Sequence, residues 1–179
     1  METQLSKGKD SGNLYLGIDV GSVSTKFAII NEKMELVYDT WARTQGSPIQ
    51  SVQQGFNILK KSFGAKEPLI KAVGTTGSAR YLVKSIIRAD LAKTEIISHA
   101  VAASYYCPDV RTILEIGGQD SKLILMREGI ITDFTMNSIC AAGTGSFLDH
   151  QASRLGIPIE EFGDYAARSQ VEVAIAGRC

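Results

Sequence analysis

A short segment near the start of the chain combines acidic, glycine and small residues in a pattern that suits phosphate chemistry. It reads DVGSVSTK from Asp19 to Lys26 and separates two apolar runs. Gly21 permits a tight turn, so the backbone N–H groups of residues 22–25 can point at one anion. A carboxylate at the end of a buried strand is costly unless it meets a cation or water, so Asp19 suits Mg²⁺ held through water. Alone, the segment fits equally well a Gly-Ser hairpin in which Asp19 caps the turn.

A second segment, EIGGQD at residues 115–120, repeats this pattern. Gly117 and Gly118 stand where a backbone can approach a phosphate closely. Two acidic, glycine-bearing hairpins can face each other across a cleft and hold a triphosphate, and the pair is more specific than either segment. Neither is a Walker A loop, and no GxGxxG follows the first strand, which disfavours the P-loop and dinucleotide-binding folds.

Cys140 precedes a Gly-Thr-Gly sequence at Gly143 to Gly145 that is typical of a helix start. The free N–H groups and the positive dipole end of such a helix favour an anion, and they also favour the thiolate of a nearby cysteine. A buried, inert cysteine is the commoner interpretation of an isolated Cys140. The chain has 3 cysteines in all; we assign Cys107 to packing, and Cys179, alone, indicates nothing.

The composition limits the classes of function. The 179 residues carry 19 Lys+Arg against 19 Asp+Glu, so there is no basic surplus for nucleic-acid binding. The apolar runs are far shorter than the roughly 20 residues that span a bilayer. Residues 1–12 are polar and lack the apolar core of a signal peptide, which indicates a flexible leader. We therefore expect a cytoplasmic protein that binds neither membrane nor nucleic acid.

The hydrophobic pattern predicts strands alternating with helices and therefore an α/β fold with a mixed sheet, in one domain from residue 13 to residue 179. The expected strands are 14–20, 25–30, 36–42, 69–73, 96–97, 112–116, 122–126 and 130–136, and the expected helices are 48–63, 78–87, 99–107, 143–155 and 158–167.

Four motifs in this order, DVGS..TK, EIGGQDSK, MN..CAAGTG.FLD and a terminal RC, resemble the activator ATPases of 2-hydroxyacyl-CoA dehydratases. These form the BadF/BadG/BcrA/BcrD-type ATPase family of the acetate and sugar kinase, Hsp70 and actin superfamily. The resemblance implies an actin-like, ribonuclease H-like fold with flanking helices. Because the family continues beyond the position of Cys179, we expect only the N-terminal lobe here and, with it, weak ATP binding and poor hydrolysis.

The resemblance further implies ATP, Mg²⁺ and a [4Fe-4S] cluster shared by a homodimer, with Cys140 and Cys179 as ligands. A cubane cluster takes four thiolates, and a two-fold dimer supplies two plus two. A reduced ferredoxin or flavodoxin would load the cluster, and ATP hydrolysis would drive the electron into a dehydratase or a benzoyl-CoA reductase-type partner.

The predicted catalytic residues are Asp19, Lys26, Gln119 and Asp120. The predicted nucleotide-binding residues are Asp19, Gly21, Ser22, Val23, Ser24, Thr25, Lys26, Glu115, Gly117, Gly118, Gln119, Asp120, Gly143 and Gly145. Glu115 departs from the aspartate usual in the family, which lengthens the reach toward a metal. Two alternatives remain: a sugar or carboxylic-acid kinase of the same superfamily, and a non-catalytic nucleotide-binding module.

Overall fold

A computed structural model describes residues 12–64, 69–137 and 143–173, and in it the chain forms two compact units. The first unit is Met1–Val101 and the second is Ala102–Cys179. Helix α3 (Glu95–Tyr106) crosses from one unit to the other. The predicted leader, except its last residue, and both Cys140 and Cys179 lie outside the described residues.

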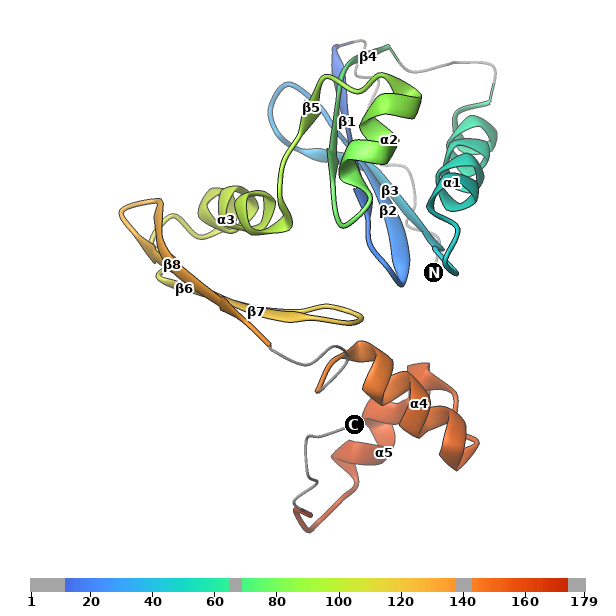
Figure 1. The fold of residues 1–179 in the computed structure, drawn as a ribbon, viewed down its shortest axis with the longest axis vertical. Helices are drawn as coiled ribbons and strands as arrows, with labels where there is room; N and C mark the ends of the chain where they lie inside the picture. Colours follow the sequence, from blue (N-terminus) through green and yellow to red (C-terminus); the bar gives the residue numbers. More distant parts are fainter. Residues whose placement is uncertain (1–11, 65–68, 138–142, 174–179) are drawn as a thin grey trace. The chain divides into compact units, whose positions relative to one another are not determined.

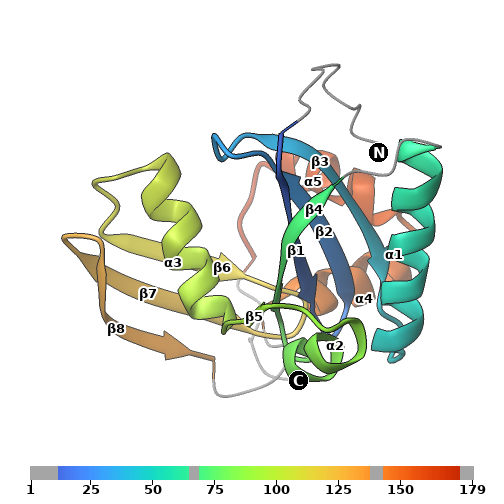
Figure 2. The ribbon, with the colours of Figure 1, turned by 90° about the horizontal axis from the view of Figure 1, so that it is seen from above.

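The first unit is built on a five-stranded mixed sheet in the order β3-β2-β1-β4-β5 (Figures 1 and 2). Its strands are β1 (Leu14–Val20), β2 (Ser24–Ile30), β3 (Leu36–Arg43), β4 (Ile70–Thr76) and β5 (Leu91–Ala92). Strands β1, β2 and β3 form an antiparallel meander, whereas β4 pairs with β1, and β5 with β4, in parallel. The central strand β1 therefore has a partner on each side.

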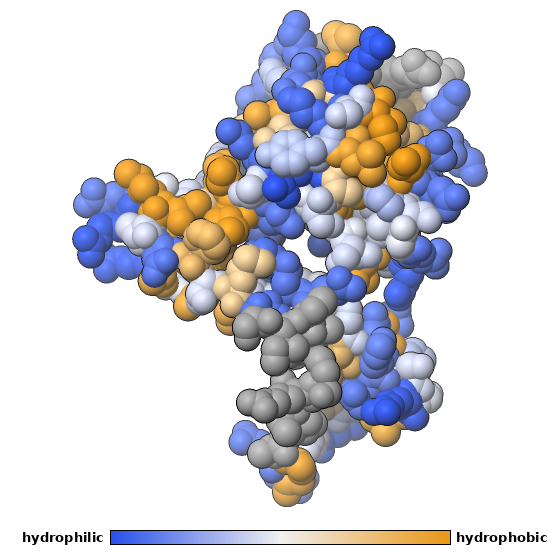
Figure 3. All heavy atoms as spheres, viewed as in Figure 1, coloured by the Kyte–Doolittle hydropathy of each residue, from blue (hydrophilic) through white to orange (hydrophobic). Residues whose placement is uncertain are grey.

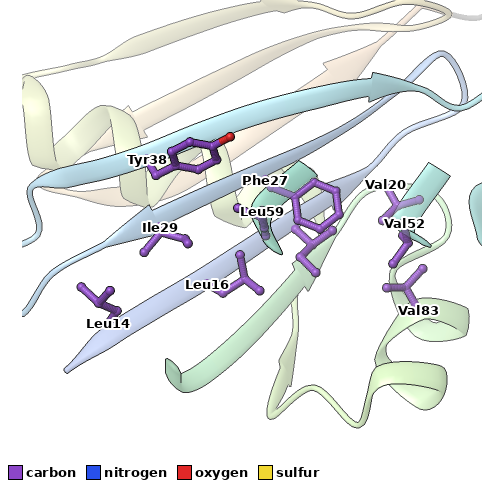
Figure 4. Close-up of a cluster of buried hydrophobic side chains, with 10 residues drawn as sticks. Leu14, Leu16, Val20, Phe27, Ile29, Tyr38, Val52, Leu59 and Val83 are labelled. Atoms are coloured by element: carbon purple, nitrogen blue, oxygen red, sulfur yellow. The ribbon is translucent and has the colours of Figure 1, made fainter. Parts of the chain in front are cut away.

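Two helices, α1 (Pro48–Phe63) and α2 (Arg80–Ile87), bury the hydrophobic core of the first unit. Side chains that alternate along the strands, such as Leu16 and Ile18, meet Val52 of α1 and Val83 of α2 in one cluster (Figure 4). Alternation places one residue in two on the buried face, and the neighbouring residues on the opposite face.

A glycine in α1 permits the closest approach between helix and sheet. A Cβ at Gly55 would lie only 1.9 Å from the ring of Phe27, which is 1% exposed. The Phe27 ring therefore occupies the space that any other side chain at position 55 would need.

The second unit contains a three-stranded antiparallel sheet, β6 (Thr112–Ile116), β7 (Ser121–Arg127) and β8 (Ile130–Met136), and two helices, α4 (Gly145–Leu155) and α5 (Ile159–Ala167), that contact each other. Few of its apolar side chains are buried: Ile124 and Met126 of β7 are, but Leu114 and Ile130 are exposed. Hydrophobic side chains accordingly show on the surface over these strands (Figure 3).

The predicted mixed sheet with flanking helices is confirmed, and two local predictions are wrong. Ile96 and Ile97 belong to α3 and not to a strand: the N–H of Ser98 donates to Thr94 O at 3.0 Å, so helical turns already begin there, and the short strand is β5 instead. Cys107 is exposed, so it does not pack in a core. No helix of the described segments has the length and hydrophobicity needed to cross a bilayer.

Candidate functional site

The first predicted phosphate segment forms a tight turn between β1 and β2. The N–H of Gly21 donates to Ser24 O at 3.0 Å and closes the turn. Within the described part of the chain, the N–H groups of Ser22 and Val23 donate to no acceptor. The turn thus presents two adjacent backbone donors, as an anion-binding nest does.

Asp19 and Lys26 flank this turn as cross-strand partners. Asp19 is half-buried and Lys26 is exposed, and both lie on the face of the sheet opposite the buried core. The two predicted catalytic residues of this segment are therefore brought together at the mouth of the turn.

Three buried hydroxyl groups lie on the core side of this turn. Thr25 Oγ1 lies 3.0 Å from Thr44 Oγ1 and 2.7 Å from Ser51 Oγ, and all three residues are at most 4% exposed. Thr44 Oγ1 donates to Gly21 O at 2.8 Å, and the N–H of Thr44 donates to Val23 O at 2.8 Å. The Thr25 side chain thus points into the core and away from the face of the sheet on which Lys26 lies.

A third segment, which sequence reasoning missed, completes the surroundings of Asp19. Strand β4 runs to Thr76, beyond the predicted end at residue 73, and Thr76 is a Cα partner of Asp19. At Gly77, which has a φ of +90°, a Cβ would lie 2.4 Å from Val20 O and 2.7 Å from Asp19 Oδ1. The sequence GTTGS at residues 74–78 was the available signal, because glycine allows such close approach.

The second predicted segment forms the corresponding turn between β6 and β7. The N–H of Gly117 donates to Asp120 O at 2.8 Å, as that of Gly21 does to Ser24 O. The N–H groups of Gly118 and Gln119 have no acceptor among the residues that the structure describes. Both turns therefore offer two donors at equivalent positions.

Lys122 joins the two acidic residues of this turn and is the second residue that sequence reasoning missed. Its Nζ lies 2.9 Å from Glu115 Oε2 and 2.7 Å from Asp120 Oδ1, and its side chain is 5% exposed. Burial lowers the pKa of Lys122, but hydrogen bonds to Asp120 and Glu115 and their charges outweigh this and raise it above its usual 10.5. Lys122 occupies the position in the second turn that Lys26 occupies in the first, so an alignment of the two sequence segments would have identified it.

The N-terminus of α4 packs directly on the second turn. The N–H groups of Gly145 and Ser146 donate to Gly117 O at 3.0 Å and Gly118 O at 2.8 Å, and the hydroxyl of Thr144 donates to Gly118 O at 2.9 Å. These helix donors are therefore committed to the turn. Gly143 is exposed with a φ of +66°, and Gly145 allows the close contact, since a Cβ there would lie 3.3 Å from Gly117 O.

Asn137, which follows β8, forms two hydrogen bonds with Ser121 at the start of β7. Its Oδ1 accepts the N–H of Ser121 at 2.9 Å, and its own N–H donates to Ser121 O at 3.1 Å. Asn137 and Thr144, which lie on either side of Cys140 in the sequence, are thus bonded to Ser121 and to Gly118 respectively.

The predicted metal ligands cannot be placed, since Cys140 and Cys179 lie outside the described residues. Within residues 12–64, 69–137 and 143–173, no three His, Cys, Asp or Glu side chains group as a metal site. The cluster therefore remains an expectation that rests on the sequence.

Comparison with known proteins gives consistent results. The model of the BadF/BadG/BcrA/BcrD ATPase family matches residues 16–179. The (R)-2-hydroxyglutaryl-CoA dehydratase activating ATPase of Acidaminococcus fermentans is 35% identical over 92% of this chain and 62% of its own. A subunit of the benzoyl-CoA reductase of Thauera aromatica is 28% identical over 91% of this chain and 58% of its own.

A solved structure agrees in fold. The activator of the 2-hydroxyisocaproyl-CoA dehydratase from Clostridium difficile, with bound ADPNP, matches with a TM-score of 0.81 and 32% identity over 91% of this chain. This match confirms the predicted actin-like ATPase fold. The chain spans 58–62% of the length of the three relatives named here.

Proposed function

The chain belongs to the BadF/BadG/BcrA/BcrD ATPase family. We propose that it binds the phosphates of ATP with Mg²⁺ and acts as part of an ATP-dependent activator of a dehydratase or reductase. The observation that carries the proposal is the pair of equivalent turns. In each turn two adjacent N–H groups, those of residues 22–23 and 118–119, have no acceptor among the described residues. Backbone donors in such a turn stabilise a phosphate without a dedicated side chain.

The flanking side chains supply the charge that phosphoryl transfer needs. In this reaction, positioning and electrostatic stabilisation provide most of the catalysis. We propose that Asp19 holds Mg²⁺ through water, that Lys26 faces the phosphates, and that Gln119 and Asp120 orient the reacting groups. The cation on Lys122 offsets one of the two carboxylates at the second turn, which lowers the repulsion that an incoming phosphate meets.

The electron-transfer part of the proposal rests on the cysteines. Two thiols per chain, Cys140 and Cys179, give a homodimer the four sulfur ligands of a [4Fe-4S] cluster. When bound, such a cluster supplies one low-potential electron. The donor would be a ferredoxin or flavodoxin, and the acceptor a 2-hydroxyacyl-CoA dehydratase or benzoyl-CoA reductase-type component.

Nucleotide binding is tested by titrating ADPNP with Mg²⁺ into the chain and into Asp19→Asn and Asp120→Asn, followed by calorimetry. We expect saturable binding that each substitution weakens at least about tenfold, since each removes a carboxylate proposed to hold Mg²⁺ or to orient the reacting groups. Asp109→Asn, on an exposed carboxylate next to Pro108, is the matched control and should bind as the wild type does. Equal affinity in all four proteins would contradict the assigned site.

The cluster is tested by anaerobic reconstitution with iron and sulfide. Cys140→Ser should lose bound iron and the broad visible absorbance that dithionite bleaches, whereas Cys107→Ser, which changes an exposed cysteine outside the predicted ligand set, should keep both. Unchanged iron in Cys140→Ser would remove that residue from the ligand set. A colourless wild-type protein that phosphorylates a small metabolite would favour the kinase alternative.

A further inference from the structure

In both turns a buried threonine hydroxyl holds a glycine carbonyl. Thr44 Oγ1 donates to Gly21 O at 2.8 Å in the first unit, and Thr144 Oγ1 donates to Gly118 O at 2.9 Å in the second. The two threonines are 4% and 0% exposed. Each comes shortly before the helix that follows its three-stranded meander, α1 in one unit and α4 in the other.

The carbonyl that each threonine holds determines where a turn N–H points. In a trans peptide the C=O and the N–H point in opposite directions. The peptide of Gly21 O carries the N–H of Ser22, and the peptide of Gly118 O carries the N–H of Gln119. Both are among the N–H groups without an acceptor in the described part of the chain. A threonine hydroxyl that holds the carbonyl toward the protein interior therefore directs the N–H of the same peptide away from the interior.

The surroundings leave Thr44 little freedom. Each hydroxyl has one proton. The Thr44 hydroxyl donates its proton to Gly21 O, and the Ser51 hydroxyl donates its proton to Pro48 O. In the contacts of Thr25 with these two hydroxyls, Thr25 is therefore the donor. At the second turn the N–H of Ser146 shares Gly118 O with Thr144 and fixes it further.

We propose that Thr44 and Thr144 are positioning residues, one for each turn, which orient the N–H groups of Ser22 and Gln119 toward phosphate without touching the nucleotide themselves. This inference rests on the proposed function, because it assigns a role within the same two turns. The two held carbonyls stand one position apart when the turns are aligned, so each threonine orients a different N–H group of its own turn.

The test replaces each threonine by valine, which keeps the shape and removes the hydroxyl, and by serine, which keeps the hydroxyl. With Mg²⁺ and ADPNP as the probe, Thr44→Val and Thr144→Val should each bind about tenfold more weakly, the change expected for one lost hydrogen bond. Thr44→Ser and Thr144→Ser should bind within about threefold of the wild type. Thr40→Val on β3 and Thr135→Val on β8 are the matched controls and should leave the affinity unchanged.

A second measurement does not depend on nucleotide. NMR order parameters of the Ser22 and Gln119 amides should fall in the corresponding valine variants and stay at wild-type values in the serine variants. Valine variants that bind and stay ordered as the wild type does, or serine variants that lose as much as valine, overturn the inference. A wild-type chain that binds no ADPNP overturns the proposed function instead, and the order parameters then decide whether the threonines hold the turns.

Discussion

The two turns share backbone geometry but differ in the charge around their lysines. Position by position, Asp19, Gly21, Ser24 and Lys26 of the first turn correspond to Glu115, Gly117, Asp120 and Lys122 of the second. Because Asp120 stands where the first turn has Ser24, the second lysine meets two carboxylates and is buried between them, while Lys26 is exposed. The lysine of the second turn is thus tied to its own turn by two carboxylates, whereas the lysine of the first turn is exposed.

The two units also differ in how much of their apolar surface is buried. In the first, β1 pairs with β2 and β4, and a cluster of buried side chains fills the space under α1 and α2. In the second, the described strands leave β6 paired with β7 alone, and several apolar side chains are exposed. The first unit therefore rests on hydrophobic packing, whereas polar contacts at the second turn carry more of the local order in the second.

The largest effect is expected from Gly55→Ala in the first unit. A Cβ 1.9 Å from the buried Phe27 ring forces the helix or the ring to move, and we expect a loss of about 3 kcal/mol in the free energy of unfolding. Trp41 is the single tryptophan of the chain and lies in the first unit, so its fluorescence follows the unfolding of that unit.

Gly163→Ala in α5 is the matched control, since a Cβ there has nothing within 4 Å. It should raise the stability of its helix by up to about 1 kcal/mol, as alanine is the better helix former. It should also leave the Trp41 transition unchanged. A Gly55→Ala transition at the wild-type midpoint would show that the core of the first unit is loosely packed.

A smaller effect is expected from Lys122→Met, which tests the contrast between the lysines directly. It leaves two carboxylates without their cation in a partly buried site, and we expect a loss of about 2 kcal/mol by far-UV circular dichroism. Lys26→Met, on an exposed side chain, should change stability by less than about 0.5 kcal/mol. Equal losses in the two variants would mean that the lysines occupy equivalent environments.

The smallest effect is a pH dependence. The folded-state pKa of Lys122 is raised above its usual 10.5, so its contribution to stability is fully present below that pH and is lost as the pH rises through the folded value. The stability difference between wild type and Lys122→Met should therefore shrink above about pH 10.5. Denaturant titrations of both proteins from pH 9 upward measure it, and a difference that grows with pH would contradict the raised pKa.

The sequence predicted the strands and turns well because local rules govern them. Gly21 and Gly117 mark the turns, and alternation of apolar residues marks the meanders that they join. The pattern failed at Ile96 and Ile97, because two β-branched residues are too few to distinguish a strand from the first turn of a helix.

Side-chain direction and cross-strand partners were harder to predict. Thr25 belongs to the predicted phosphate segment, yet its hydroxyl lies between those of Thr44 and Ser51. Thr44 comes from the connection between β3 and α1, and Ser51 from α1, so only the folded chain brings the three residues together. The two ion pairs of Lys122 depend on the strand register, which places Lys122 opposite Glu115. The proposed role of Thr144 likewise depends on α4 folding back onto the second turn, which no local pattern encodes.

The bonds at Asn137 and Thr144 tie the end of β8 and the start of α4 to the second turn and the residue beside it. Both are held by the same short stretch of chain, residues 117–121, through Ser121 on one side and Gly118 on the other. A substitution that shifts residues 117–121 would therefore disturb the last residues of the sheet and the first residues of the helix together.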